Sequence, residues 1–181
     1  GEKLKGDEAI DLVIGNNKKA DLIPLLEECL AGKEVTGSII DIGATHEYET
    51  LHIAKQADHT RAFIKVQDGC SQGCAYCIIP LTRGPSRSRP VEDIVAEAHR
   101  LLASGHREIL LSGVNLRQFH SGSGDGRNFW SLLRRLDSEL APEWAGRARF
   151  RLSSLDPAQV TGAMGAECLE TLEGCRMLCP Q

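Results

Sequence analysis

Apolar residues recur along the first part of the chain in two spacings, one typical of strands and one typical of helices. Residues 10–15 form a short run rich in β-favouring side chains that ends at a glycine, which predicts a strand. Across residues 18–30 the apolar positions then fall three or four apart, which predicts an amphipathic helix. Gly32 follows at the position that a helix C-terminal cap prefers, so the two runs indicate a β-α unit.

The text from residue 33 to residue 60 is mixed and polar, with one expected strand at residues 38–42. We interpret most of it as a connection between two domains and place the boundary near Asp58. Residues 1–58 are therefore expected to form one domain plus a linker, and residues 59–181 a second domain.

Strand and helix patterns alternate regularly after that boundary. We expect strands at residues 61–67, 108–111 and 147–153, and helices at residues 91–102, at residues 129–140 and around residues 167–172. This alternation predicts an α/β fold with a parallel sheet, either open or closing into a barrel. Because such folds carry their chemistry at the carboxyl ends of the strands, the loops after the strands are where functional residues are expected.

Composition narrows the class of protein. The chain has 181 residues, of which 41% are hydrophobic and 25% charged, and it contains no run of the roughly 18 apolar residues that a membrane span needs. The first seven residues are polar and do not look like a secretory signal, so we expect a cytoplasmic protein that does not bind membranes. A net charge of -4 argues against electrostatic binding of nucleic acid over the whole surface, because such binding needs an excess of basic residues. A local basic patch could still bind it.

Three of the seven cysteines, Cys70, Cys74 and Cys77, crowd into one loop after the first expected strand of the second domain. The spacing C-x3-C-x2-C suits metal ligation in a reducing compartment better than a disulfide framework. Three thiolates can hold a 4Fe-4S cluster and leave one iron open for a substrate. The alternatives are a zinc site with a fourth ligand from elsewhere, or a ferredoxin-like electron carrier, whose cysteine spacing differs.

This loop, with Tyr76 between the last two cysteines, resembles the signature of radical S-adenosylmethionine (SAM) enzymes. The resemblance implies that Cys70, Cys74 and Cys77 hold a 4Fe-4S cluster whose open iron binds the methionine part of SAM. It also implies that Tyr76 lies beside the adenine of SAM. An electron from the reduced cluster would cleave SAM to a 5'-deoxyadenosyl radical.

The resemblance extends to residues 65–70 (KVQDGC), 77–80 (CIIP) and 83–89 (RGPSRSR), which are similar to the MiaB-like tRNA methylthiotransferases. Residues 112–116 (SGVNL) and 151–157 (RLSSLDP) are similar to the MtaB-type branch, which acts on N6-threonylcarbamoyladenosine. The fold that this implies is the end of an N-terminal α/β methylthiotransferase domain, followed by the first half of a radical SAM (β/α)6 partial barrel.

The family's second 4Fe-4S cluster would have its ligands outside this chain, and the later barrel strands and the RNA-binding TRAM domain are not in the sequence either. We therefore expect a fragment that is inactive alone. The intact enzyme is expected to act on tRNA whose A37 is threonylcarbamoylated, with an electron donor such as flavodoxin or ferredoxin. The deoxyadenosyl radical would remove the hydrogen on adenine C2, sulfur would take its place, and a second SAM would methylate that sulfur.

Two other functions stay open on the sequence alone. The same chemistry could act on N6-isopentenyladenosine in tRNA or on a ribosomal protein. From a different class, the chain could be a non-catalytic iron-sulfur or zinc-binding module.

Further candidate residues flank the cysteine loop or end the later strands. Arg83, Arg87 and Arg89 stand in an acid-free stretch and could contact the SAM carboxylate, the RNA or the protein itself. Four residues near the ends of the second and third strands are candidates for SAM binding: Ser112, Gly113, Asn115 and Ser153. Three cysteines near the end of the chain lie among leucines and are expected to be small buried side chains without a metal: Cys168, Cys175 and Cys179.

Overall fold

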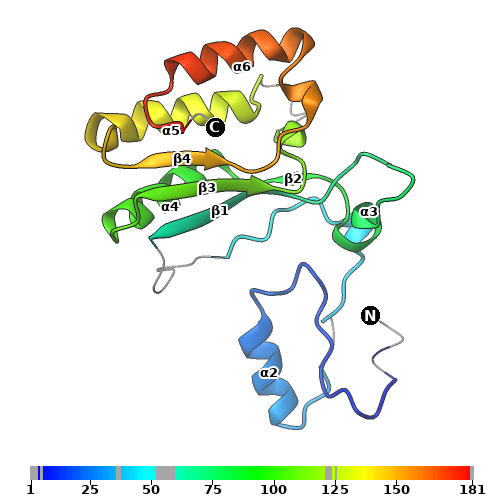
Figure 1. The fold of residues 1–181 in the computed structure, drawn as a ribbon. Coiled ribbons are helices and arrows are strands. Elements are labelled where there is room, and N and C mark those ends of the chain that lie inside the picture. Colours follow the sequence, from blue (N-terminus) through cyan, green and yellow to red (C-terminus); the bar gives the residue numbers. More distant parts are fainter. Residues whose placement is uncertain are drawn as a thin grey trace.

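A four-stranded sheet forms the centre of the second half of the chain in the computed structural model, which describes residue 4 and residues 6–35, 38–51, 60–120, 124 and 126–179. The strand order is β2-β1-β3-β4 (Figure 1). The three longer strands, β1 (Arg61–Asp68), β3 (Glu108–Gly113) and β4 (Arg149–Leu152), run parallel, and β2 (Arg87–Ser88) pairs antiparallel with the end of β1. The predicted α/β class with a parallel sheet is therefore confirmed.

The predicted helices of this half are also confirmed, and they extend beyond their expected ends. They are α4 (Val91–Ala103), α5 (Phe129–Trp144) and α6 (Gly162–Gly174). Helix α5 continues through Pro142 because Trp144, in its last turn, is buried in the core and stacks against two arginine side chains. Shorter turns connect the elements: α3 (Ile79–Arg83), η2 (Leu116–Gln118) and η3 (Pro157–Gln159).

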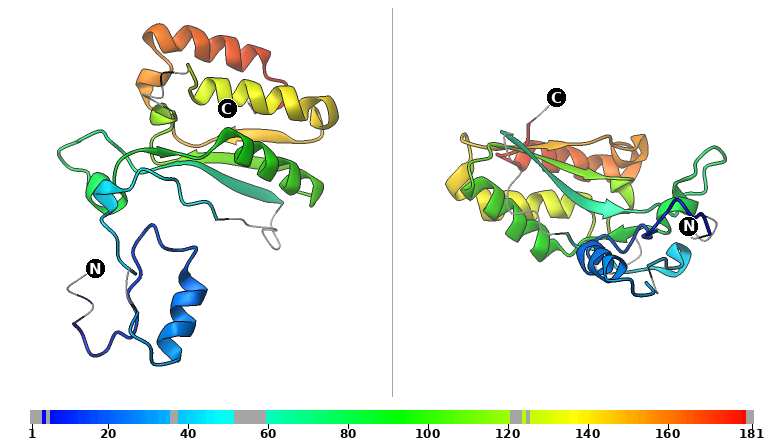
Figure 2. Two further views of the ribbon diagram at one scale, coloured as in Figure 1. Left: turned by 180° about the vertical axis from the view of Figure 1, so that it is seen from behind. Right: turned by 90° about the horizontal axis from the view of Figure 1, so that it is seen from below.

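One face of the sheet is buried under these helices. Along β1, Ala62, Ile64 and Val66 are fully buried, whereas Phe63 and Lys65 between them lie on the other face. This alternation follows from the two-residue repeat of a strand, and the buried residues of β3 and β4 extend the same face. In Figures 1 and 2, α5 and α6 lie side by side along β4 while α4 lies along β1 and β3. The apolar surface thus fixes which face of each strand points to the helices.

The parallel register brings the loops after β1, β3 and β4 to one edge of the sheet. Arg61, Glu108 and Arg149 are paired at the amino ends, and Gln67 is paired with Gly113 at the carboxyl ends. After β4, the Ser153 N–H donates to the carbonyl of Leu111 at 3.0 Å. The cysteine loop and the segments that carry Asn115 and Ser153 consequently leave the sheet at the same end.

The N-terminal segment follows the sequence prediction only in part. Helix α2 (Leu22–Leu30) forms within the predicted helix, and Gly32 adopts the left-handed conformation expected of its cap, with φ +68°. The strands predicted at residues 10–15 and 38–42 are wrong, because the two segments share one backbone hydrogen bond, from Gly15 to Ser38, and a strand requires a continuing ladder. A short turn, η1 (Ile42–Ala44), occupies the end of the second segment. The predicted domain boundary at Asp58 lies outside the described residues.

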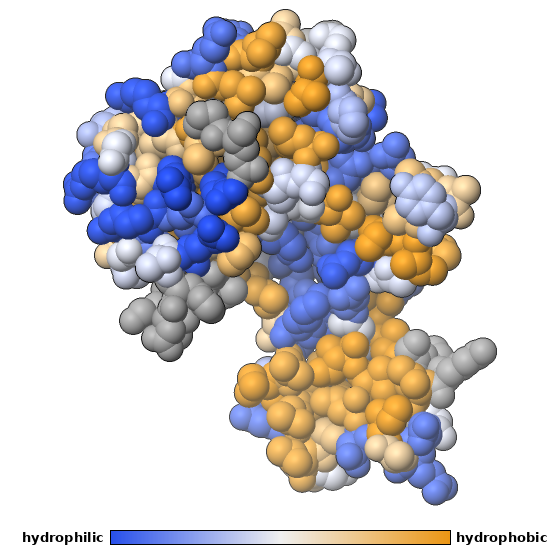
Figure 3. All heavy atoms as spheres, viewed as in Figure 1, coloured by the Kyte–Doolittle hydropathy of each residue, from blue (hydrophilic) through white to orange (hydrophobic). Residues whose placement is uncertain are grey.

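Polar and backbone contacts join this segment to the sheet domain near the cysteine loop. The Asn16 side chain donates to the carbonyl of Thr82 at 2.9 Å, and the Tyr48 hydroxyl donates to the carbonyl of Lys65 at 2.8 Å. A Cβ on Gly84 would lie 2.2 Å from the carbonyl oxygen of Ile42, so the two backbones touch there. Away from this junction the segment presents an apolar surface (Figure 3), to which exposed side chains of α2 such as Ile23 contribute.

Candidate active site

The three cysteines of the predicted cluster loop lie directly after β1, at the carboxyl end of the sheet. Cys70 is buried, Cys74 and Cys77 are half-buried, and all three are free thiols. The Cys70 N–H donates to the carbonyl of Gly84, and the Cys77 N–H donates to the carbonyl of Cys74, each at 3.0 Å. The loop is therefore held at its first cysteine by residues 83–89, which we call the arginine segment.

The donor chemistry of this loop fits an iron-sulfur cluster. Soft thiolates are the protein ligands of such clusters, and N–H donors near the sulfur atoms tune them. The Gln72 N–H lies 3.4 Å from the Cys70 Sγ, and the Asn115 side-chain amide lies 4.0 Å from it. Among the residues that the structure describes, no three His, Cys, Asp or Glu side chains are gathered closely enough to hold a metal ion. The residue types and their common loop thus fit the group, although the thiols are not drawn together.

Two glycines at or near the start of this loop allow other parts of the backbone to approach very closely. Gly69 has φ +70°, and an added Cβ would lie 2.0 Å from the carbonyl oxygen of Pro85. Gly84 has φ +73° and meets the backbone of Ile42 in the same way. Left-handed backbone without a side chain is required at both positions, which explains why the sequence reads glycine there.

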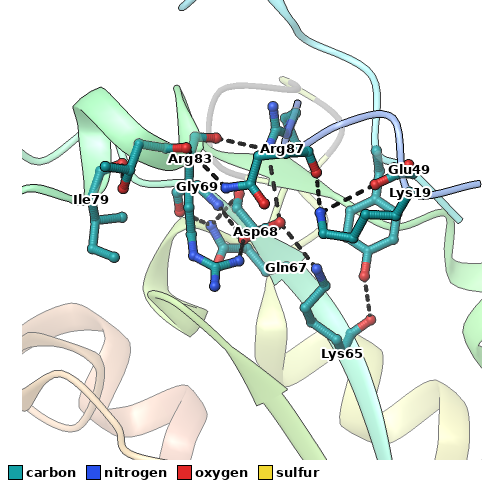
Figure 4. A network of polar contacts seen from close by, with 12 residues as sticks. Lys19, Glu49, Lys65, Gln67, Asp68, Gly69, Ile79, Arg83 and Arg87 are labelled. Carbon is teal, nitrogen blue, oxygen red and sulfur yellow. Dashed lines mark hydrogen bonds and ion pairs between the residues drawn. The ribbon is translucent and has the colours of Figure 1, made fainter. Parts of the chain in front are cut away.

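Asp68, the last residue of β1, is the centre of an ion-pair network that involves two of the predicted arginines (Figure 4). Its carboxylate lies 3.0 Å from Lys65, 3.3 Å from Arg83 and 3.8 Å from Arg87, and it accepts the Gly69 N–H at 2.9 Å. Burial by itself would raise the pKa of this carboxyl, but the hydrogen bond and charge of Lys65, the Gly69 N–H and the charge of Arg83 together lower the pKa. Asp68 is therefore an anion that holds the arginine segment against β1.

The predicted arginines differ in how far they are committed to the protein itself. Arg87 is buried and donates to the carbonyl of Arg83 at 2.7 Å, and Arg89 is buried against Glu97 of α4. Arg83 keeps 39% of its side chain exposed. Of the three interpretations that the sequence left open, internal pairing thus holds for all three residues, and Arg83 has the most surface left for a ligand.

Tyr48, from the connection before β1, covers the exposed face of the strand beside these ion pairs. The Lys65 ammonium lies 5.5 Å from the centre of its ring. Burial raises the pKa of the Tyr48 hydroxyl, so this group stays protonated as the donor to the Lys65 carbonyl. A cavity of about 220 Å³ lies here between Tyr48, Phe63, Arg89 and Ser112.

The residues predicted at the ends of β3 and β4 have different surroundings. Ser112 donates to the carbonyl of Ile64 at 3.4 Å, and Gly113 packs against Gln67 and Leu116. The Asn115 side chain reaches the cysteine loop, where it donates to the Gln72 Oε1 at 3.1 Å. The structure therefore brings Asn115 to the cysteine loop, Gly113 to Gln67 near the end of β1, and Ser112 to the neighbouring strand.

Ser153 and Tyr76 are the remaining predicted SAM contacts. The Ser153 hydroxyl is buried and has no hydrogen-bond partner within the described part of the chain. Tyr76 is 93% exposed at the outside of the cysteine loop. Their roles toward SAM stay predictions.

Sequence reasoning missed three polar side chains that fasten the cysteine loop. Gln67 is fully buried and donates to the carbonyls of Asp68 and Gly69, directly before Cys70. Gln118 accepts the Ser71 N–H at 2.9 Å, and the Ser71 hydroxyl accepts the Ser86 N–H at 3.1 Å. The two-residue repeat of β1 would put Gln67 on the face of Phe63 and Lys65, so the sequence pattern gave no sign of its burial.

Part of the chain is similar to known proteins of one enzyme superfamily. Residues 64–119 match the profile of the radical SAM superfamily. The chain is 30% identical over 164 residues to the threonylcarbamoyladenosine tRNA methylthiotransferase MtaB of Bacillus subtilis, an alignment that covers 91% of the chain and 34% of that relative. It is 43% identical over 102 residues to the protein of the same name from Chlamydia pneumoniae, covering 56% of the chain and 22% of the relative.

A relative with a different name also matches. The tRNA-2-methylthio-N(6)-dimethylallyladenosine synthase of Malacoplasma penetrans is 29% identical over 153 residues, which cover 83% of the chain and 30% of that protein. The chain thus spans about a third or less of the length of these curated relatives. In the described part of the chain, no helix has the length and apolar character needed to cross a bilayer.

Proposed function

The chain belongs to the MtaB-type radical SAM methylthiotransferases, and on this basis we propose that the protein transfers a methylthio group to C2 of N6-threonylcarbamoyladenosine at position 37 of tRNA. The observation that carries the proposal is the meeting of two loops at the carboxyl edge of the sheet. Cys70 begins the loop after β1, and Asn115, from the loop after β3, lies against it. A site built from loops of neighbouring parallel strands is where α/β folds hold their ligands.

Each predicted residue has a role in this proposal. Cys70, Cys74 and Cys77 hold a 4Fe-4S cluster, which when bound supplies an open iron for SAM and the electron for its reductive cleavage. Asn115 orients the loop and donates toward the Cys70 sulfur. The remaining contacts to SAM come from Tyr76, Ser112, Gly113 and Ser153.

Arg83 has a separate role because its side chain is partly exposed at the edge of the cysteine loop. A guanidinium there suits the carboxylate of SAM or a phosphate of the RNA. Arg87 and Arg89 are buried, and they hold the segment that carries Arg83 against Asp68 and Glu97. A second cluster with ligands outside this chain, and an electron donor such as flavodoxin or ferredoxin, complete the proposed enzyme.

Nucleoside mass spectrometry of tRNA tests the substrate. A strain that lacks the gene should lose 2-methylthio-N6-threonylcarbamoyladenosine and keep the unmethylthiolated nucleoside, and the intact gene should restore the loss. The similarity to the Malacoplasma penetrans relative favours one second candidate, the isopentenyladenosine nucleoside. Loss of the 2-methylthio form of that nucleoside alone would replace the proposed substrate with this one.

Anaerobic reconstitution with iron and sulfide tests the chemistry. The full-length protein should gain the broad visible absorption of an iron-sulfur cluster and should form deoxyadenosine from SAM once dithionite is added. A protein that binds zinc and stays colourless would instead be the non-catalytic module. Reconstitution with a visible cluster but without deoxyadenosine would leave a non-catalytic iron-sulfur module.

A further inference from the structure

The side chain of Gln67, the second-last residue of β1, carries a fully buried amide just before the cysteine loop. Its Nε2 donates to the carbonyl of Asp68 at 3.0 Å, to the carbonyl of Gly69 at 2.7 Å and to the Ser86 Oγ at 2.9 Å. Its Oε1 accepts the N–H of Asn115 at 2.9 Å. Two amide hydrogens are shared among three oxygens, so every polar atom of the side chain is in use.

These bonds join three parts of the chain that are distant in sequence. Ser86 lies 19 residues after Gln67 in the arginine segment, and Asn115 lies 48 residues after it in the loop that follows β3. Gly113 closes the space beside the amide, because a Cβ there would lie 3.1 Å from the Gln67 Oε1. The side chain therefore has one position, and in that position it fixes the start of the cysteine loop relative to Asn115.

We propose that Gln67 is a positioning residue that sets the placement of the cysteine loop against the Asn115 loop and thereby sets the affinity for SAM. The inference rests on the proposed function, because it assumes that SAM is bound between these two loops. Glutamine suits the position because its amide donates to the carbonyls of the cysteine loop and accepts from the Asn115 backbone at once. A glutamate lacks the donors, an apolar residue lacks both functions, and an asparagine is one methylene shorter.

The test compares Gln67→Met and Gln67→Glu with a matched control in the full-length enzyme. Methionine preserves length and approximate volume but removes all the hydrogen bonds. The control is Thr171→Val in α6, which also removes buried hydrogen bonds, to Arg134 and to the Glu167 carbonyl, but lies outside the carboxyl edge of the sheet. Melting temperature, iron per chain, SAM affinity by equilibrium dialysis, and KM and kcat for deoxyadenosine formation are measured for each.

Gln67→Met is expected to weaken SAM binding and raise KM for SAM by roughly 10- to 100-fold, the range found when partners of metal ligands are removed. Its kcat should fall less than its kcat/KM, which is the pattern of a lost contribution to binding. Thr171→Val should lower the melting temperature comparably and leave SAM affinity and KM at wild-type values. A structural role alone would move the melting temperature of both variants and the KM of neither.

Gln67→Glu adds a pH signature. A glutamate buried among carbonyl oxygens has a raised pKa, and only its protonated form can donate a hydrogen to Gly69 while it accepts from the Asn115 N–H. Its SAM affinity should therefore recover as the pH falls from about 8 to about 6, by more than any change in the wild-type enzyme over that range. An affinity difference that does not vary with pH would contradict the assigned hydrogen bonds.

Different results would contradict the proposed function and the positioning role of Gln67. If wild-type enzyme forms no deoxyadenosine, the proposed function is wrong, and a lower iron content in Gln67→Met than in Thr171→Val would still support the placement of the cysteine loop by Gln67. If wild-type enzyme is active and Gln67→Met retains its SAM affinity, KM and iron content, the positioning role is wrong and the proposed function stands.

Discussion

Replacing Gly69 with alanine should destabilise the protein because this residue begins the cysteine loop in a conformation that only glycine adopts easily. Its φ is +70°, and an added Cβ would lie 2.0 Å from the Pro85 carbonyl oxygen and 2.8 Å from that of Gly84. Both obstacles are backbone atoms, so no side chain can rotate away. The loop and the arginine segment would have to move apart.

The size of the effect follows from two contributions. Left-handed backbone costs a residue with a Cβ about 1–2 kcal/mol. Separating the segments also breaks the hydrogen bond from the Cys70 N–H to the Gly84 carbonyl, which contributes about 1 kcal/mol. Gly69→Ala should therefore lower the free energy of unfolding by about 2–3 kcal/mol.

Urea denaturation measures this change, and Gly73→Ala in the same loop is the control. Gly73 has no heavy atom within 4 Å of an added Cβ and does not have positive φ. With a slope of about 2 kcal/mol per molar urea, the midpoint of Gly69→Ala should fall by roughly 1–1.5 M. That of Gly73→Ala should stay near the wild-type value. Equal midpoints for the two variants would refute the steric argument.

Three further predictions concern the ion pairs and the thiols. Glu97→Ala leaves the buried Arg89 guanidinium without its carboxylate and should lower the free energy of unfolding by about 3–5 kcal/mol in urea denaturation; an unchanged midpoint would contradict the buried pair. The pKa of Asp68 is lowered from its ordinary value of 3.8, so its contribution to stability is present above that value and is lost as the pH falls through the folded-state pKa. The stability difference between wild type and Asp68→Asn should therefore shrink on acidification from about pH 5 to about pH 3, and a constant difference would count against the network. Cys74→Ala in the full-length enzyme should abolish deoxyadenosine formation and leave the circular dichroism spectrum unchanged; continued SAM cleavage would exclude Cys74 as a ligand.

The sheet domain was predictable because local pattern and tertiary packing agree there. The alternation in β1 and the helical spacing in α4 each mark a buried face, and the structure buries those same faces. The two predicted strands of the N-terminal segment failed for the converse reason. Residues 10–15 and 38–42 have the composition of strands, but composition does not provide a neighbour for a hydrogen-bonded ladder.

The arginine segment shows the same limit within the candidate site. Its sequence contains no acid, so the sequence could not say what Arg87 and Arg89 contact. Their carboxylate partners are Asp68, from the end of β1, and Glu97, from α4. The antiparallel pairing of β2 with β1 places Arg87 opposite Asp68, and the packing of α4 brings Glu97 to Arg89.

The sequence by itself predicted the chemical type of the site, because three thiols within one loop suit an iron-sulfur cluster or zinc wherever the loop lies. It also predicted that this loop directly follows a strand, because the residues before it alternate as in a strand with one buried face. The tertiary structure alone decided that Gln67, Ser86 and Asn115 meet, since hydrogen bonds between residues 19 and 48 positions apart depend on strand order and register. Local pattern records the face of a strand, whereas the neighbour of that strand is fixed only when the whole sheet packs.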